Sequence, residues 1–201
     1  MKERVTLTIE KELLAKVDAT IDNEQIKNRS HAVELLLRKT LRGQAPNTAI
    51  ILAGGKSDEV EAFADDVPKT LIKIKGKPIL EYNIDLLKKY GVGKVIIAIA
   101  HKGELIKEYF GDGSSFGINI SYVEEKQPLG TAGSLRLIKD QLTEPFIMMN
   151  GDELKNVDLS RLYAAHNRYE ATVTIALTTV NDPESFGVAM LDGNNILRFV
   201  E

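Results

Sequence analysis

The stretch TAIILAGG, residues 48–55, joins a short apolar run to a pair of glycines. A continuous apolar run that ends in glycine is typical of a strand buried on both faces of a parallel sheet, because neither face of such a strand meets solvent. Ligands of parallel sheets bind where the strands end, and glycine lets the backbone approach a ligand closely. Gly54 and Gly55 therefore mark a candidate binding site.

The same pattern recurs along residues 49–201. Apolar stretches that favour strands alternate with amphipathic stretches that favour helices. The expected strands are 49–53, 94–100, 120–124, 145–150 and 172–178, and the expected helices are 78–91, 103–111, 131–142 and 158–169. This alternation predicts a Rossmann-like, mostly parallel α/β sheet that is covered by helices on both faces.

Composition sets broad limits on function. The 201 residues are 43% hydrophobic and 27% charged, and they contain no cysteine, which excludes disulfides, thiolate catalysis and cysteine-ligated metals. No apolar run approaches the roughly 20 residues of a membrane helix, and the first ten residues do not have the pattern of a signal peptide. We therefore expect a cytoplasmic protein with no membrane partner.

The chain divides near residue 44. Residues 1–43 hold nine Lys and Arg against seven Asp and Glu, a net charge of +2, whereas residues 44–201 hold 17 against 22, a net charge of −5. Glycine, proline and small polar residues separate two periodic regions here, and we take 44–48 as a linker. The sequence therefore predicts two domains, residues 1–43 and residues 49–201.

Residues 1–43 have the pattern strand, helix, helix. Polar and apolar residues alternate over 4–9, which predicts a strand, and apolar residues at helical spacing follow over 13–21. Ser30 stands at the expected N-cap of a second helix. Because so short a segment buries too little apolar surface to fold alone, we expect a homodimer through residues 1–43 that pairs its strands and shares one core.

The stretches KERVTLTI (2–9) and NRSHAVELLLRKTL (28–41) resemble the ribbon-helix-helix repressors. The resemblance implies that a two-stranded ribbon enters the major groove of a palindromic or repeated DNA operator, with the start of the second helix on a phosphate. The DNA-binding residues that it implies are Arg4, Thr6, Thr8, Asn28, Arg29, Ser30 and His31. The alternative is a dimerisation module whose strand has an ordinary solvent-exposed face.

The larger region carries five motifs at fixed distances, namely LAGG (52–55), PK (68–69), GKPI (76–79), QPLGTAG (127–133) and NGD (150–152). Together they resemble the sugar-phosphate nucleotidyltransferases, which join a nucleoside triphosphate to a sugar 1-phosphate and release pyrophosphate. The LGTAG variant is most similar to enzymes that handle mannose 1-phosphate or glucose 1-phosphate. The resemblance implies the nucleotidyltransferase fold for residues 49–201.

The resemblance also implies roles for single residues. Asp152 would hold Mg²⁺, since a carboxylate at a strand end suits a hard cation, and Lys69 is the candidate catalytic residue. Gly187 and Glu201 would line the sugar pocket. The implied nucleotide-binding residues are Ala53, Gly54, Gly55, Lys69, Gln127, Gly130 and Thr131.

Two departures from the family pattern bear on activity. Glu59 stands where the family has an arginine that clamps the triphosphate, and phosphoryl chemistry depends on positive charge at that point. The sequence ends at Glu201, before the position of the family's second metal-binding aspartate. Both departures predict little or no transferase activity, and neither excludes ligand binding.

The leading hypothesis from these features is a DNA-binding transcriptional regulator whose degenerate nucleotidyltransferase domain binds a nucleotide or sugar nucleotide as effector. The first alternative is an active, Mg²⁺-dependent sugar-1-phosphate nucleotidyltransferase of the mannose- or glucose-1-phosphate type, dimerised by its N-terminal segment. A third hypothesis is a dimer whose second domain is only a scaffold.

Overall fold

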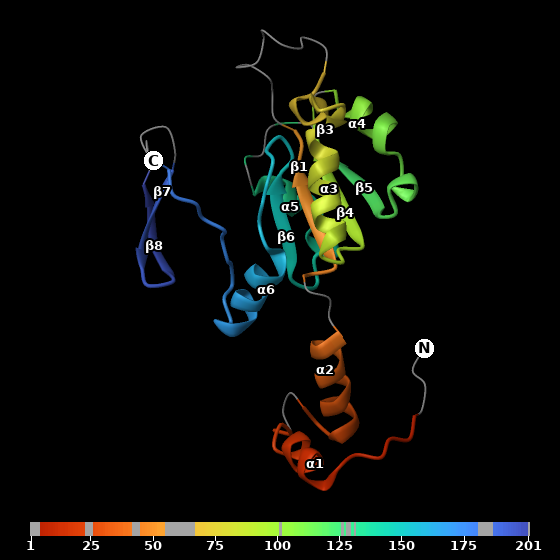
Figure 1. The fold of residues 1–201 in the computed structure, drawn as a ribbon, viewed down its shortest axis with the longest axis vertical. Helices are drawn as coiled ribbons and strands as arrows, with labels where there is room; N and C mark the ends of the chain where they lie inside the picture. Colours follow the sequence, from red (N-terminus) through yellow and green to blue (C-terminus); the bar gives the residue numbers. More distant parts are fainter. Residues whose placement is uncertain are drawn as a thin grey trace.

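The computed structural model describes residues 5–22, 26–41, 45–54, 67–100, 102–125, 127, 130, 132–180 and 187–200, and the structural statements below concern these residues. Within them a four-stranded sheet forms the centre of the larger region (Figure 1). Its strands are β1 (Thr48–Leu52), β4 (Lys94–Ile99), β5 (Asn119–Glu124) and β6 (Phe146–Asn150), in the order β5-β4-β1-β6. All neighbouring strands are parallel, which confirms the expected mostly parallel α/β fold.

Helices cover both faces of this sheet. α3 (Ile79–Lys89), α4 (Gly103–Phe110) and α6 (Leu159–Arg168) pack on one face, and α5 (Gly133–Leu137) packs on the other. Successive strand residues face opposite sides, so Ile51 lies in the larger core with α3, whereas Ile50 lies in the smaller core beside α5. Among the described residues, no helix has both the length and the apolar character that crossing a bilayer requires.

The helices begin and end where the sequence provides local signals. Asp158 caps α6, because its Oδ1 accepts hydrogen bonds from Ser160 N and Arg161 N, both at 3.0 Å. Gly111 ends α4 with a φ of +54°, a conformation that glycine adopts without the steric cost of a Cβ atom.

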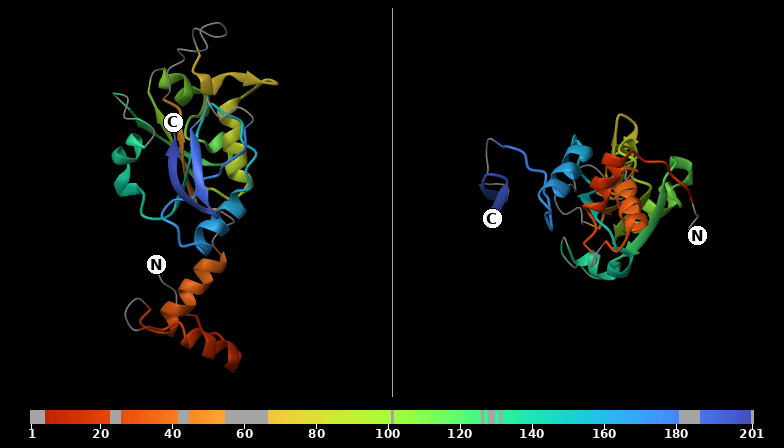
Figure 2. Two further views of the ribbon diagram at one scale, coloured as in Figure 1. Left: turned by 90° about the vertical axis from the view of Figure 1, so that its left-hand side faces the viewer. Right: turned by 90° about the horizontal axis from the view of Figure 1, so that it is seen from below.

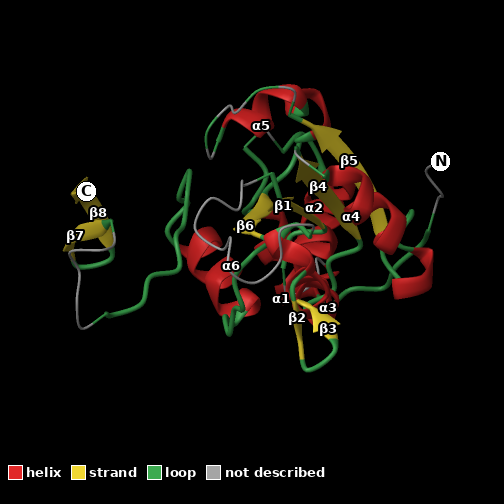
Figure 3. Ribbon diagram, turned by 90° about the horizontal axis from the view of Figure 1, so that it is seen from above, coloured by secondary structure: helices red, strands yellow, loops and turns green. Residues whose placement is uncertain are grey.

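Short elements connect the main ones. The 3₁₀ helix η1 (Lys69–Leu71) precedes an antiparallel pair, β2 (Lys73–Ile74) and β3 (Lys77–Pro78), and two more 3₁₀ helices are η2 (Ser114–Phe116) and η3 (Lys139–Gln141). β7 (Val188–Asp192) and β8 (Asn195–Val200) form an antiparallel hairpin that lies apart from the sheet (Figures 1 and 3).

The expected strand at 172–178 is wrong for this structure. The described backbone there is not in any strand, and Val173, Ile175 and Leu177 are 70%, 44% and 50% exposed. A strand needs a neighbour for its N–H and C=O groups, and this segment has none among the described residues. The segment therefore has the alternating apolar pattern of a strand, but no strand among the described residues pairs with it.

The N-terminal region holds two helices, α1 (Lys11–Asp18) and α2 (Arg29–Leu41), at the edge of the sheet where the strands begin (Figures 1 and 2). The expected strand at 4–9 does not form over the described residues 5–9, and Val5 and Leu7 are 69% and 58% exposed. The described residues of a single chain offer this segment no partner strand, so its apolar face stays open to solvent.

The N-cap of α2 is Asn28, and the expectation of Ser30 at that position is wrong. Asn28 Oδ1 accepts a hydrogen bond from His31 N at 2.9 Å, and Asn28 O accepts one from Ala32 N at 2.9 Å. Ser30 therefore lies inside the first turn of the helix.

Candidate functional site

The carboxyl ends of β1 and β6 lie side by side at a point where the chain changes direction across the sheet. From β1 the chain continues through α3 to β4 on one side, whereas β6 enters on the other side after α5, which covers the opposite face. Open parallel sheets bind ligands in the crevice at such a switch point. The candidate site is therefore at the ends of β1 and β6.

Backbone hydrogen bonds hold the two loops of this site together. Gly151 N donates to Leu52 O at 2.8 Å, which places the start of the loop after β6 against the last residue of β1. Ala53 N donates to Ala98 O at 2.7 Å, so this amide is already engaged. The Ala53 amide is therefore not available to a ligand in this structure.

Gly54 and Gly151, at the ends of β1 and β6, occupy tight positions. A Cβ atom on Gly54 would lie 3.1 Å from the Cβ of Ala100. A Cβ atom on Gly151 would lie 2.9 Å from Ile51 Cγ2 and 3.1 Å from both Leu52 O and Thr70 Cγ2. Thr70 belongs to η1, so the element that begins with Lys69 packs against the loop after β6.

Gly151→Ala is expected to lower the free energy of unfolding by about 1–3 kcal/mol, because the added methyl meets the backbone oxygen of Leu52 and cannot relax by side-chain rotation alone. Denaturant titration of the parent and the variant measures the change. An unchanged free energy of unfolding would contradict the close packing of this loop.

The two carboxylates of the loop differ in their partners. Glu153 accepts hydrogen bonds from Asn150 Nδ2 at 3.0 Å and Lys155 Nζ at 3.2 Å. The hydrogen bond from Asn150, helped by the charge of Lys155, holds the pKa of the Glu153 carboxyl below its usual value. Asp152 is exposed and makes no ion pair with a described residue, so its carboxylate is free to meet a cation.

This donor set suits Mg²⁺ only in company with a phosphate ligand. The described residues contain no group of three or more His, Cys, Asp or Glu side chains that is arranged to hold a metal. Mg²⁺ in phosphate-transfer sites is commonly held by one or two carboxylates, with water and substrate phosphates completing the octahedron. Asp152 fits the first part of that arrangement.

The structure brings part of the predicted site together. Ala53, Gly54, Lys69 and Asp152 gather at the switch point, and Gln127 and Gly130 follow the carboxyl end of β5 at the same edge of the sheet. Gly187 precedes β7 in the separate hairpin, so the structure does not bring it to the others (Figure 3). Outside the described residues are Arg4, Gly55, Glu59, Thr131 and Glu201.

Asn83, which lies on the buried face of α3, is a site residue that the sequence pattern did not predict. Its Nδ2 donates to Gly151 O at 3.2 Å and to Glu153 O at 3.0 Å. The only sequence signal is an asparagine among the apolar positions of this helix, between Leu80 and Leu87.

The N-terminal candidates make local contacts. Arg29 forms a two-pronged ion pair with Asp18, with Nε–Oδ1 and Nη2–Oδ2 distances of 2.6 and 2.7 Å. The hydrogen bond from Arg29 lowers the pKa of the Asp18 carboxyl. Arg29 thus joins α1 to α2, and Asn28 caps α2, whereas Thr6 and Thr8 are exposed.

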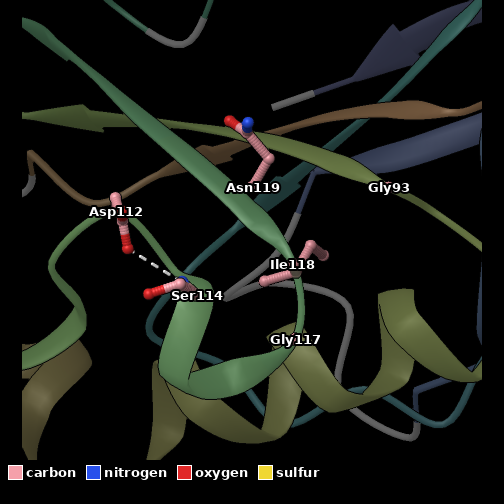
Figure 4. A pocket seen from close by; sticks show the side chains of 6 residues that line it. All are labelled: Gly93, Asp112, Ser114, Gly117, Ile118 and Asn119. Atoms are coloured by element: carbon pink, nitrogen blue, oxygen red, sulfur yellow. Dashed lines mark hydrogen bonds between the residues drawn. The ribbon is translucent and has the colours of Figure 1, made fainter.

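A shallow pocket lies at the opposite edge of the sheet, where β4 and β5 begin (Figure 4). Ser114 N donates to Asp112 Oδ1 at 2.9 Å, and hydrogen bonding from Ser114 lowers the pKa of this carboxyl. The pocket is lined by Gly93, Asp112, Ser114, Gly117, Ile118 and Asn119, and it contains no residue of the candidate site.

A parallel sheet with a glycine and an exposed carboxylate at its switch point places the protein among the open-sheet α/β proteins, which bind ligands at this position. Comparison with known proteins identifies the family. Residues 48–201 match the sequence model described as "Nucleotidyl transferase", and the chain belongs to this family.

Its relatives include several guanylyltransferases. The D-glycero-alpha-D-manno-heptose 1-phosphate guanylyltransferase of Campylobacter jejuni is 36% identical over 149 residues, which are 74% of this chain and 65% of that protein. The enzyme of the same name from Aneurinibacillus thermoaerophilus is 34% identical, with 76% and 66% covered. Mannose-1-phosphate guanylyltransferase catalytic subunit beta of Danio rerio is 36% identical, with 76% and 44% covered. The match thus spans 44–66% of the length of these relatives.

Solved structures share the fold. HddC from Yersinia pseudotuberculosis, complexed with GMP-PN, superposes with a TM-score of 0.62 at 23% identity, covering 78% of this chain and 69% of HddC. The inositol-1-phosphate CTP transferase from T. maritima superposes with a TM-score of 0.59 at 23% identity, with 78% and 64% covered.

These findings correct the leading hypothesis from the sequence. The prediction of a DNA-binding transcriptional regulator is wrong, because the relatives are named sugar-1-phosphate guanylyltransferases at 33–36% identity and favour the enzymatic alternative. The comparisons give no support for DNA as a partner or for a ribbon-helix-helix domain.

Proposed function

We propose that residues 48–201 form the active site of a nucleotidyltransferase that joins a guanine nucleoside triphosphate to a sugar 1-phosphate of manno configuration. The observation that carries this proposal is the junction of β1 and β6, where the glycine turn and the Asp152 loop are tied by the Gly151 N–Leu52 O hydrogen bond. The relatives support the substrate class, since their names combine guanylyl transfer with mannose or a manno-heptose.

In the proposed reaction, a phosphate oxygen of the sugar 1-phosphate attacks the α-phosphorus of the nucleotide. The bond from the α-phosphorus to the bridging oxygen breaks, and pyrophosphate leaves. Gly54 and Gly55 would offer backbone N–H groups to the phosphates, Lys69 would supply a positive charge, and Asp152 would hold Mg²⁺. Gln127, Gly130 and Thr131 would receive the base. The family pattern assigns the sugar to Gly187 and Glu201, although the structure does not bring Gly187 to the other site residues.

Bound Mg²⁺ supplies charge neutralisation for the triphosphate in this proposal. Asp152 would hold the metal, since Glu153 is engaged by Asn150 and Lys155. The two carboxylates would thus have different roles, because Glu153 is paired within the protein and Asp152 is exposed and would meet the cation.

Pyrophosphate release measures the proposed activity. GTP is paired with mannose 1-phosphate, glucose 1-phosphate or no acceptor, with Mg²⁺ or with EDTA, and ATP, CTP and UTP replace GTP in parallel reactions. We expect pyrophosphate release to require both the sugar acceptor and Mg²⁺, and to be fastest with GTP and mannose 1-phosphate. The rate should be low, because Glu59 stands where the family has an arginine that binds the triphosphate. Absence of release with every pair, in a protein that binds GTP, would contradict the proposal.

Residues 1–43 form the proposed dimerisation unit, joined by 44–48 to the nucleotidyltransferase unit at 49–201. The support is the open apolar face at the N-terminus, where Val5, Leu7 and Leu13 are 69%, 58% and 54% exposed. In the proposed dimer, two copies of 4–9 pair as antiparallel strands and cover these side chains, as in a ribbon-helix-helix arrangement.

Leu7→Asp is therefore expected to halve the molecular mass in solution, because a charge enters the apolar interface. Thr6→Asp is the matched control, since Thr6 lies on the other face of the alternation and adds the same charge. Light scattering after size-exclusion chromatography measures both variants. Equal masses for Leu7→Asp and the parent would contradict dimerisation through this face.

A further inference from the structure

The loop after β6 is hydrogen-bonded to a side chain that is buried in the core. Asn83 is 1% exposed and lies in the middle of α3. Its Nδ2 donates to Gly151 O at 3.2 Å and to Glu153 O at 3.0 Å. These two carbonyls belong to the residues immediately before and after Asp152. One side-chain amide therefore holds the backbone on both sides of the exposed Asp152 carboxylate.

The other contacts of Asn83 show what this side chain does. Its Oδ1 has no hydrogen-bond partner among the described residues. Both hydrogen bonds that the Asn83 side chain makes with described residues therefore go to the loop. Its neighbours on the buried face of α3 are the apolar Leu80, Ile84 and Leu87. A buried amide contributes less to apolar packing than an apolar side chain does. The main contribution of Asn83 is therefore its hydrogen bonds to the two loop carbonyls.

We propose that Asn83 is a positioning residue, which fixes the backbone on both sides of Asp152 and so sets the place of the carboxylate that meets Mg²⁺ and the nucleotide phosphates. Gly151 is held on its other side by Leu52 O and by close packing with Ile51 and Thr70. Asp152 thus lies between two anchored residues, and its side chain starts from a fixed backbone position. The metal part of this inference rests on the proposed function.

The test compares two Asn83 variants, which lack the N–H donors of the amide, with a control variant that keeps Asn83. Asn83→Asp has nearly the same shape and loses both N–H donors, and Asn83→Leu replaces the amide with an apolar side chain of similar size. Asn167→Asp is the matched control, because Asn167 is exposed on α6 and donates to Tyr163 O at 3.0 Å, away from the loop.

Two measurements separate positioning from general stability. Calorimetric titration with GTP, in EDTA and in Mg²⁺, gives the gain in GTP affinity that the metal provides. In both Asn83 variants, we expect the increase in GTP affinity that Mg²⁺ provides to be at least tenfold smaller than in the parent. GTP affinity in EDTA should stay within twofold of the parent's. Amide hydrogen exchange is expected to rise at 151–155 and to stay unchanged in β4, at 95–99.

Each outcome decides the inference. A full metal-dependent gain in the Asn83 variants, or exchange that rises equally in the loop and in β4, would overturn it, since a merely structural role predicts that pattern. If the parent binds GTP equally with and without Mg²⁺, the proposed metal role of Asp152 fails. Hydrogen exchange in the loop then decides the positioning role by itself. If Asn83→Asp does not fold, Asn83→Leu carries both measurements.

Discussion

Asp152→Asn is expected to lower kcat/KM for Mg²⁺-dependent pyrophosphate release by about 10³-fold or more, which corresponds to about 4 kcal/mol of transition-state stabilisation. The amide keeps the shape of the carboxylate and removes the negative charge that holds the cation. Because Asp152 is exposed and unpaired with any described residue, the free energy of unfolding should stay within about 0.5 kcal/mol of the parent. Steady-state kinetics at several Mg²⁺ concentrations, with a denaturant titration, measure both quantities.

Asp140→Asn is the matched control for this substitution. Asp140 is an exposed carboxylate on η3, outside the candidate site, and its loss changes the net charge of the chain equally. The control should keep the parent's kcat/KM within about twofold. If Asp152→Asn is as active as Asp140→Asn, Asp152 is not the metal ligand.

Glu59→Arg is expected to raise kcat/KM for the nucleotide by about 10²–10³-fold. Two like charges about 4 Å apart at an effective dielectric constant of 20 repel each other by about 4 kcal/mol, and arginine replaces that repulsion with a fork that fits phosphate oxygens. The prediction depends on the family pattern in the sequence, since Glu59 lies outside the described residues. Kinetics with GTP as the varied substrate measure it.

Glu61→Arg controls for the change in net charge, because Glu61 lies two residues further along the same segment. Long-range attraction of the triphosphate should affect both variants equally, whereas a direct contact should favour Glu59→Arg by at least tenfold. Equal effects of the two substitutions would show that Glu59 does not occupy the position of the family's arginine.

The central sheet could be predicted from the sequence because each of its strands is a nearly continuous apolar run. β1, β4, β5 and β6 each lie within about one residue of their expected bounds, and so do most ends of α3, α4 and α6. The strands expected at 4–9 and 172–178 have the same local signal but no neighbour among the described residues. Pairing is a property of two segments, so one apolar pattern cannot establish it.

The candidate site could be predicted in part for the same reason. Ala53, Gly54 and Asp152 follow strands, and parallel strands end at one edge of a sheet, so their meeting follows from topology. The contact of Asn83 with Gly151 joins residues 68 positions apart through the packing of α3, and no local pattern encodes it.

The pairing of β1 with both β4 and β6 also has a consequence for synthesis on the ribosome. Thr48 pairs with Lys94 on one side and with Phe146 on the other, so the second partner emerges about 50 residues after the first. At roughly 5–20 residues per second, this delay lasts about 3–10 s. During that time one edge of β1 offers its free N–H and C=O groups to any extended chain nearby, a recognised route to aggregation. Until β6 is synthesised and pairs with β1, the site residues that follow β1 therefore lie next to an unpaired strand edge.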